Sequence, residues 1–189
     1  MKTTILMAIM LSLASISALA DSEEKGSDSN LPRFFEVVAT QIFRGGQPND
    51  QGLIELAQMK MKTILDLRDE KDLIPIESAK VRKLGLNFIS VPLSAWQAPK
   101  DSDIALILSA LNKVELRPIF IHCQHGQDRT GLVVGLFRFF DQNVAASQAY
   151  AEMKSKGFHS ILHALTNYFF LKTGLGFDEA VGFEKTNLN

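Results

Sequence analysis

The sequence predicts an α/β fold in which helices cover both faces of a central, mostly parallel sheet. Short apolar segments of strand length alternate with longer segments of helical periodicity, an order typical of strand–helix–strand units. The segment 118–122, "PIFIH", is apolar without alternation up to its last residue, as expected for a strand buried on both faces. The chain has 189 residues, of which 46% are hydrophobic, and this fits one globular domain.

The individual elements follow from the same patterns, and no internal repeat is visible. Extended segments or strands are expected over 36–46, 62–68, 86–91 and 118–122. Helices are expected over 50–59, 75–84, 101–115, 129–141, 145–156 and 160–172.

The first 20 residues differ from the rest of the chain. Lys2 precedes an apolar run over 5–13, and the segment ends in Ala-Leu-Ala, a pattern typical of a secretory signal peptide cleaved after Ala20. The run is shorter than the roughly 20 residues that a membrane-spanning helix needs. We therefore expect an exported protein, periplasmic or secreted, with no membrane segment in its mature form. Its expected regions are a disordered polar lead-in over 21–30, a folded domain over 31–175 and a C-terminal tail over 176–189.

Charge and cysteine content limit the possible functions. The formal net charge of −1 gives no argument for a nucleic acid or an anionic membrane as partner, so a local cluster must hold any bound anion. Cys123 is the only cysteine and cannot form an intramolecular disulfide. Its thiol is therefore either a small buried hydrophobic group or a functional group.

The stretch "HCQHGQDRT", residues 122–130, places this cysteine between a predicted strand and a predicted helix. Ligands bind at such carboxyl ends of strands in open α/β sheets. Five residues separate Cys123 from Arg129, enough for a loop whose backbone N–H groups surround an anion. Gly126 permits unusual dihedral angles and a close approach of the ligand. The helix N-terminus and the Arg129 guanidinium complete a site suited to phosphate.

The same stretch supports nucleophilic catalysis. The amide groups and the helix dipole favour the thiolate form of Cys123, which is the form that attacks phosphorus. The amides and Arg129 then stabilise the charge on the phosphoryl oxygens. Thr130 is placed to donate a hydrogen bond to the sulfur when it leaves, and His122 to orient the cysteine through backbone contacts.

The pattern H-C-x-x-G-x-x-R-T resembles the signature of the cysteine-dependent protein tyrosine phosphatase superfamily. The segments "IFRGGQP" (42–48) and "MKTILDLRDE" (61–70) are similar to dual-specificity-like phosphatases, especially bacterial tyrosine-phosphatase-like phytases and atypical fungal and plant inositol (pyro)phosphate phosphatases. The resemblance implies that Cys123 is the nucleophile and Arg129 the phosphate clamp. It also implies a phosphate-binding loop formed by Gln124, His125, Gly126, Gln127 and Asp128, followed in the sequence by Thr130 as a further phosphate-binding residue.

The general acid of the family has no obvious counterpart. Relatives carry an aspartate about thirty residues before the cysteine, where this chain has "VPLSAWQAP" (91–99) without a carboxylate. Asp101 and Asp103 lie closer to Cys123 than that and are also suited to cap a helix. Asp128, beside Arg129, is our preferred catalytic acid, although it is equally suited to brace the loop through backbone hydrogen bonds.

The expected substrate is a phosphomonoester, either a phosphorylated small molecule or a phosphoprotein. Inositol polyphosphates such as phytate are favoured by the family resemblance, by His125 in the loop and by basic residues at strand ends or in loops: Arg44, Arg68, Lys71 and Lys100. Phosphotyrosine on proteins or peptides is the alternative.

No cofactor or metal is expected. His159 and His163 have the i, i+4 spacing of zinc ligands on a helix, but the glutamate of an H-E-x-x-H motif is missing. A sulfurtransferase and an inactive phosphate-binding module fit the chain less well, because both Cys123 and Arg129 are retained at the spacing of a phosphatase.

Overall fold

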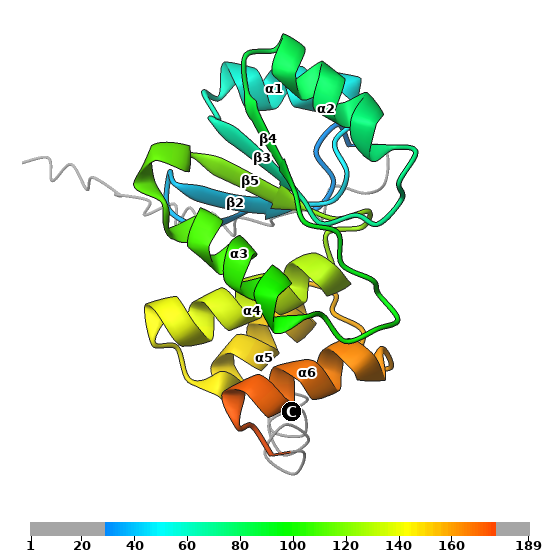
Figure 1. Cartoon of the computed structure of the whole chain (residues 1–189). Helices are drawn as coiled ribbons and strands as arrows, with labels where there is room; N and C mark the ends of the chain where they lie inside the picture. The colour runs from blue at the N-terminus through cyan, green and yellow to red at the C-terminus, as the bar shows by residue number, and fades with distance from the viewer. Residues whose placement is uncertain (1–28, 177–189) are drawn as a thin grey trace, which may run out of the picture.

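The computed structural model describes residues 29–176 (Figure 1). The predicted signal peptide over 1–20, residues 21–28 of the lead-in and residues 177–189 of the tail lie outside the described residues. No helix within 29–176 is both long and apolar enough to cross a membrane.

The predicted α/β class is confirmed by a five-stranded sheet in the order β1-β2-β5-β3-β4. Only β1 runs antiparallel to its neighbour, and the other pairs are parallel. The strands are β1 (Phe35–Val38), β2 (Ile42–Gly45), β3 (Thr63–Asp66), β4 (Asn87–Ser90) and β5 (Ile119–His122).

The helices occur where the periodicity predicted them. They are α1 (Asp50–Gln58), α2 (Ile74–Lys83), α3 (Asp101–Asn112), α4 (Asp128–Gln142), α5 (Ala146–Ser155) and α6 (His163–Thr173). Two boundaries differ from expectation. The segment expected as one helix to residue 115 ends at Asn112 and continues as the short 3-10 turn η1 (Val114–Leu116). Helix α6 begins at His163, three residues later than expected, so residues 160–162 belong to the same loop as His159.

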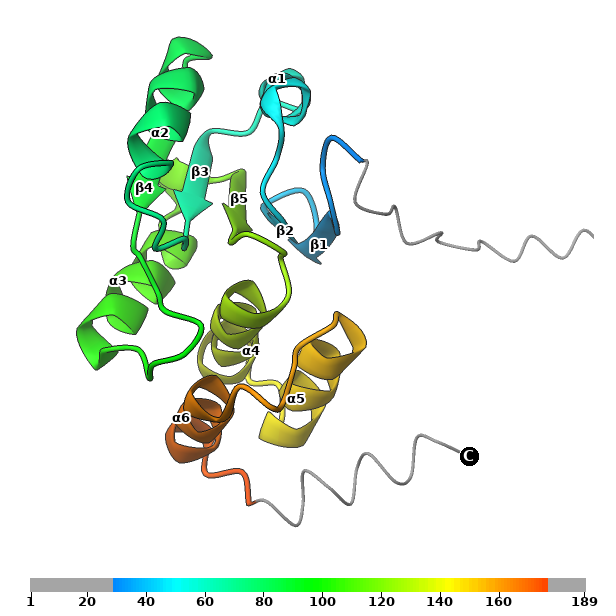
Figure 2. The same cartoon turned by 90° about the vertical axis from the view of Figure 1, so that its right-hand side faces the viewer.

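Helices cover both faces of the sheet, as expected. Helices α1 and α2 lie on one side and α3 to α6 on the other (Figures 1 and 2). Side chains alternate between the two cores along the central strand β5. Phe120 belongs to a small cluster with Phe43, Leu53 and Val81, whereas Ile119 and Ile121 belong to a larger cluster with the helices of the other face.

The folded region starts before residue 31, where the disordered lead-in was expected to end. The side chain of Asn30 donates a hydrogen bond to Glu55 of α1 (2.8 Å) and accepts one from Asn49 (2.9 Å). These contacts attach the chain to α1 just before it enters β1.

The sheet brings the ends of three parallel strands to one edge. The last residue of β5, His122, is in register with Gly45 at the end of β2 and with Asp66 at the end of β3. Residues directly after these strands are therefore neighbours, although they are far apart in sequence.

Candidate active site

The loop 123–127 connects the buried strand β5 to α4, which begins at Asp128. Gly126 adopts φ +72°, a conformation that only glycine adopts readily. Cys123 is 2% exposed and stands at the start of the loop. The turn thus brings Cys123 and the first two residues of α4, Asp128 and Arg129, to one pocket, and the N-terminus of a helix favours an anion.

Residues at the end of β2 and directly after it form hydrogen bonds to this loop. The Arg44 guanidinium donates a hydrogen bond from Nη2 to the carbonyl oxygen of Gly126 (2.7 Å). The backbone N–H of Gln47 donates a hydrogen bond to the carbonyl oxygen of Gln124 (3.1 Å). A Cβ atom on Gly126 would lie 2.5 Å from the carbonyl oxygen of Gly45. The "RGGQ" segment and the loop therefore pack backbone against backbone.

Arg129 is buried beside Cys123 and is held by acidic residues from the segment after β3. Its Nη1 atom donates to Asp69 Oδ1 (2.6 Å) and to the carbonyl oxygen of Leu93 (3.3 Å). Its Nη2 atom lies 3.7 Å from Glu70 Oε1. These contacts orient the guanidinium across the end of the pocket.

A pocket of about 360 Å³ opens above Cys123. Its polar wall consists of Cys123, His125, Asp128, Arg129 and His159. Its apolar wall consists of Ala95, Trp96, Ile161 and Leu162. Trp96 is 80% exposed and Ile161 77% exposed, so two large apolar side chains form part of the rim.

Asp128 lines the pocket and binds the loop between α5 and α6. Its Oδ1 atom accepts hydrogen bonds from the backbone N–H of His159 (2.8 Å) and from His159 Nδ1 (3.0 Å). The other carboxylate oxygen lies 3.2 Å from the same ring nitrogen. The bracing contact that the sequence left open for Asp128 is therefore present, and its partner is a histidine of the pocket.

The other two acid candidates are not brought to this pocket. Asp101 and Asp103 lie in the first turn of α3, where neither makes a side-chain capping bond. The Asp101 carboxylate instead accepts hydrogen bonds from Tyr168 (2.9 Å) and Lys172 (2.6 Å) of α6. The hydrogen bonds from these two residues lower the pKa of Asp101, which is the opposite of what a general acid needs.

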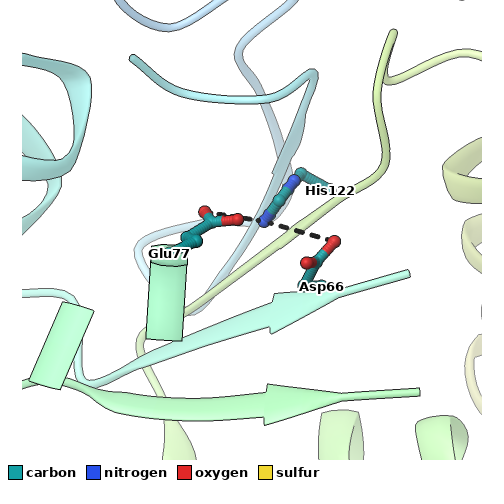
Figure 3. Close-up of side chains that lie close together, drawn as sticks. All are labelled: Asp66, Glu77 and His122. Atoms are coloured by element: carbon teal, nitrogen blue, oxygen red, sulfur yellow. Dashed lines mark ion pairs between the residues drawn. The ribbon is translucent and has the colours of Figure 1, made fainter. Parts of the chain in front are cut away.

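A buried network of charged side chains lies beneath the loop. Asp66 and Glu77 both bind the guanidinium of Arg68, through paired hydrogen bonds to Asp66 (2.9 and 3.0 Å) and an ion pair with Glu77. Figure 3 shows His122 between the two carboxylates, with Nε2 at 3.3 Å from Glu77 Oε1 and 3.9 Å from Asp66 Oδ1. Nδ1 of His122 lies 3.3 Å from the carbonyl oxygen of Cys123, and the orienting role of this histidine stays a prediction.

The network determines the charge of Glu77. Burial alone raises the pKa of this carboxyl group, but the close approach of His122 and the charge of Arg68 outweigh burial. The pKa of Glu77 therefore lies below its ordinary value. The Glu77 carboxylate remains ionised beneath the loop at neutral pH.

Asp66, Glu77 and His122 also form the one described group with the spacing of a metal site, their donor atoms lying within 4.8 Å of one another. Arg68 already provides a positive charge to both carboxylates of this group. The two carboxylates therefore already have an internal countercharge, although Glu77 Oε1 and His122 Nε2 have no hydrogen-bond partner among the described residues. His163, the second histidine of the i, i+4 pair, is exposed at the start of α6 and does not line the pocket with His159.

The basic residues expected around a polyanionic substrate do not surround the pocket. Arg44 and Arg68 are 1% and 3% exposed and bind the loop and the buried carboxylates, respectively. Lys71 and Lys100 are exposed but do not line the pocket. The expectation that these residues surround the substrate was wrong, because a position at a strand end places a side chain near the site without determining whether it points to solvent or inward.

Thr130 is fully buried, and its hydroxyl oxygen has no hydrogen-bond partner among residues 29–176. This leaves the hydroxyl available for the predicted bond to sulfur. Four residues at or beside the pocket were not predicted from the sequence to act there: Asp69, Trp96, His159 and Ile161. Asp69 had a usable signal, since the Asp-Glu pair directly follows the "LDLR" strand. His159 was considered only as a metal ligand.

Fold and site together define an α/β domain of the phosphatase type, in which a cysteine of the β5–α4 loop and an arginine in the first turn of α4 line one pocket. Residues 14–167 match the family described as "DSP-PTPase phosphatase fused to NAD+ Kinase". The chain belongs to this family, and its predicted relationship to the cysteine-dependent tyrosine phosphatase superfamily is confirmed.

Curated relatives include phosphatases of different specificity. The chain is 30% identical over 118 residues to the dual specificity protein phosphatase TpbA of Pseudomonas aeruginosa, covering 62% of this chain and 51% of TpbA. It is 27% identical over 126 residues to the inositol diphosphatase DSP5 of Arabidopsis thaliana, covering 64% of this chain and 60% of DSP5. The chain thus spans about half the length of TpbA.

Solved structures share the fold. The crystal structure of P. aeruginosa TpbA superposes with a TM-score of 0.62 at 21% identity, covering 83% of this chain and 91% of TpbA. TpbA has also been solved in complex with pTyr, with a TM-score of 0.59 at 20% identity over 86% of this chain and 98% of that one. The catalytic core of the PP-IP phosphatase SIW14 from S. cerevisiae gives a TM-score of 0.60 at 21% identity, covering 82% of this chain and 93% of SIW14.

Proposed function

We propose that this protein is a phosphatase that hydrolyses phosphomonoesters through a phosphocysteine intermediate on Cys123. One observation carries the proposal. Cys123 and Arg129 line the same pocket, at the N-terminal end of α4 and around a loop whose turn requires Gly126. Such a loop binds a phosphate dianion and holds its phosphorus against the sulfur.

In the proposed reaction the Cys123 thiolate attacks phosphorus and the ester oxygen leaves. The loop amides and the Arg129 guanidinium stabilise the charge on the equatorial oxygens. For this, phosphate replaces Asp69 as a partner of Arg129, whose Nη1 atom donates a hydrogen bond to that carboxylate in the structure. Water then cleaves the S–P bond, and the buried Thr130 hydroxyl stabilises the departing sulfur.

For the substrate we favour a phosphorylated tyrosine over an inositol polyphosphate. The apolar rim of Trp96 and Ile161 suits the face of an aromatic ring. Of the described residues, one permanent cation, Arg129, and one carboxylate, Asp128, line the pocket, a balance that gives little attraction for a ring carrying many phosphates. The names of TpbA, a dual specificity phosphatase, and of its complex with pTyr support the same choice.

Inositol phosphates, phytate among them, are the second candidate. They are supported by the similarity to the inositol diphosphatase DSP5 and to the PP-IP phosphatase SIW14. His125 is exposed in the loop and lines the pocket, where it is available to a second phosphate group.

Phosphate release from a panel of substrates tests both parts of the proposal. The panel contains phosphotyrosine and phosphoserine peptides, phytate and an inositol pyrophosphate. Wild-type protein is expected to turn over phosphotyrosine fastest, and the Cys123→Ser variant to release no phosphate from any substrate. Acid quench followed by mass spectrometry should detect a phosphorylated Cys123 in the wild type. Turnover by the Cys123→Ser variant would contradict the mechanism, whereas faster hydrolysis of the inositol compounds would contradict only the substrate.

We also propose that the protein is exported, because residues 1–20 have the pattern of a cleavable signal peptide. Expression of the full chain in a Gram-negative host should yield a periplasmic protein that begins at Asp21. A cytoplasmic protein that keeps residues 1–20 would contradict this proposal.

A further inference from the structure

The pocket lacks a free carboxylate that can protonate the leaving group. The segment 91–99 has no acidic residue, and Asp101 lies at α6 rather than at the pocket. Asp69 and Glu70 face the Arg129 guanidinium, at 2.6 Å from Nη1 and 3.7 Å from Nη2, respectively, and neither is among the pocket-lining residues. Among residues 29–176, Asp128 is the one carboxylate that lines the pocket, and it accepts two hydrogen bonds from His159.

His159 has the properties that such a proton donor needs. Its side chain is 55% exposed and lines the pocket that also contains Cys123. The carboxylate of Asp128 only accepts hydrogen bonds, so Nδ1 of His159 carries the hydrogen of this contact. Nε2 is then the ring nitrogen that remains for exchange with a substrate. Histidine gains and loses a proton near neutral pH, as a general acid must.

The loop that carries His159 is fixed against the phosphate-binding loop. Gly157 adopts φ +88° and packs against the side chain of Gln127. Phe158 is buried against Gly131 in the first turn of α4. The neighbouring residues therefore fix the backbone of His159, and Asp128 fixes its ring. A catalytic group held in place in this way is preorganised for reaction.

We propose that His159, oriented by Asp128, is the general acid and base of the reaction. This inference rests on the phosphatase function proposed above. In the first step the S–P bond forms and the P–O bond of the ester breaks, while the proton on Nε2 passes to the leaving oxygen. In the second step neutral His159 accepts a proton from the attacking water, the O–P bond forms and the S–P bond breaks. Cys123 leaves as a thiolate, phosphate is released, and protonated His159 is restored.

The charged groups around His159 are consistent with this role. Asp128 contacts its ring directly, and Arg129, His125 and Cys123 line the same pocket. In this scheme Asp128 is a positioning residue that acts through His159, because its oxygens are occupied by the histidine.

The dependence of kcat/KM on the leaving group tests the assignment. Phenyl phosphate, 4-nitrophenyl phosphate and 2,4-dinitrophenyl phosphate release progressively more acidic phenols, which need progressively less help from an acid. His159→Gln should lower kcat/KM for phenyl phosphate by about 10²- to 10⁴-fold, the usual contribution of general acid catalysis. The same variant should keep close to the wild-type kcat/KM for 2,4-dinitrophenyl phosphate, because kcat/KM reports the steps up to cleavage of the P–O bond and not the later hydrolysis of phosphocysteine. This result would also demonstrate that the variant is folded.

Two further variants make the test specific. His163→Gln removes an exposed histidine at the start of α6, outside the pocket lining, and should match the wild type on all three substrates. Asp128→Asn should show the same selective loss as His159→Gln but to a smaller extent. An equal response of His159→Gln to all three leaving groups, or a selective loss that follows His125→Gln instead, would overturn the assignment.

The outcomes also separate this inference from the proposed function. If wild-type protein releases no phosphate and forms no phosphocysteine, the phosphatase proposal itself fails. If the wild type is active and His159→Gln retains its full rate on phenyl phosphate, only the role of His159 fails.

Discussion

At the scale of single residues, the position of Arg44 explains how the loop above it is supported. The guanidinium is buried and binds the carbonyl oxygen of Gly126, yet two of its nitrogen atoms have no hydrogen-bond partner among the described residues. Burial lowers the pKa of Arg44 to about 10, and the charge of a Cys123 thiolate acts in the opposite direction. The side chain is therefore a fixed positive charge beneath the nucleophile at neutral pH.

Gly126 gives a residue-scale prediction. Gly126→Ala introduces a Cβ atom against the backbone of Gly45 and Gly46 at a positive φ, so the loop cannot keep its shape. We expect phosphatase activity to fall below detection. Gly85→Ala is the matched control, because Gly85 has φ +78° but no atom within 4 Å of the added Cβ. That control should lose about 1 kcal/mol of unfolding free energy from strain and keep its activity.

The two variants are compared by 4-nitrophenyl phosphate hydrolysis and by urea unfolding. An active Gly126→Ala protein would contradict the packing of the loop on β2.

The sequence predicted the residues of the site that belong to one contiguous pattern. Cys123, Arg129 and Gly126 lie within a single turn, where spacing alone determines their proximity. His159 was not predicted to act in catalysis, because its contact with Asp128 joins residues 31 positions apart. Arg68 was expected near a polyanionic substrate, since the sequence does not reveal that Glu77 of the following helix binds it.

At the scale of elements, α3 is attached to α6 through its first residue. Asp101 binds Tyr168 and Lys172, and burial together with the hydrogen bond to Asp101 raises the pKa of Tyr168. Local periodicity predicted both helices, but the late start of α6 was not predicted. Residues 159–162 continue the apolar pattern of a helix, but in the structure they form a loop. This loop places His159 and Ile161 at the pocket.

Asp101→Asn provides the element-scale prediction. The variant loses the ion pair with Lys172, and its stability should fall only slightly, because an exposed ion pair contributes little. Its kcat/KM values for phenyl and 2,4-dinitrophenyl phosphate should both equal those of the wild type. A selective loss on phenyl phosphate would instead make Asp101 the acid.

At the scale of the whole molecule, two apolar cores of unequal size enclose the sheet, and the charged network of Asp66, Arg68, Glu77 and His122 lies at its carboxyl edge. The α/β class followed from the order of elements, but the strand order β1-β2-β5-β3-β4 did not. The first hairpin pairs with β5 from the second half of the chain, and no local pattern specifies such a partner.

Glu77 gives the prediction for the molecule as a whole. Its folded pKa is lowered, so its ion pairs stabilise the protein fully above the ordinary carboxyl value of 4.5. This contribution is lost as the pH falls through the lower folded pKa. Glu77→Gln should destabilise the protein by about 3 to 5 kcal/mol at neutral pH, as expected when one partner of a buried pair is removed.

Urea unfolding over about pH 3 to 7 measures this effect. The stability difference between wild type and Glu77→Gln should shrink toward low pH. The exposed control Glu115→Gln should follow the wild type throughout. A difference that is constant with pH would contradict the ionised state of Glu77.

The hydrogen bond from Arg44 to Gly126 joins residues 82 positions apart, and it has a consequence for the order of folding. Helix α4 and strand β5 form from neighbouring segments of the chain. The loop between them is stabilised by Arg44 of β2 only after β2 has paired with β5. Contacts of such high sequence separation form slowly, because loop closure must come first. During refolding, catalytic activity should therefore return no earlier than the pairing of β2 with β5, even if most helical structure has already formed.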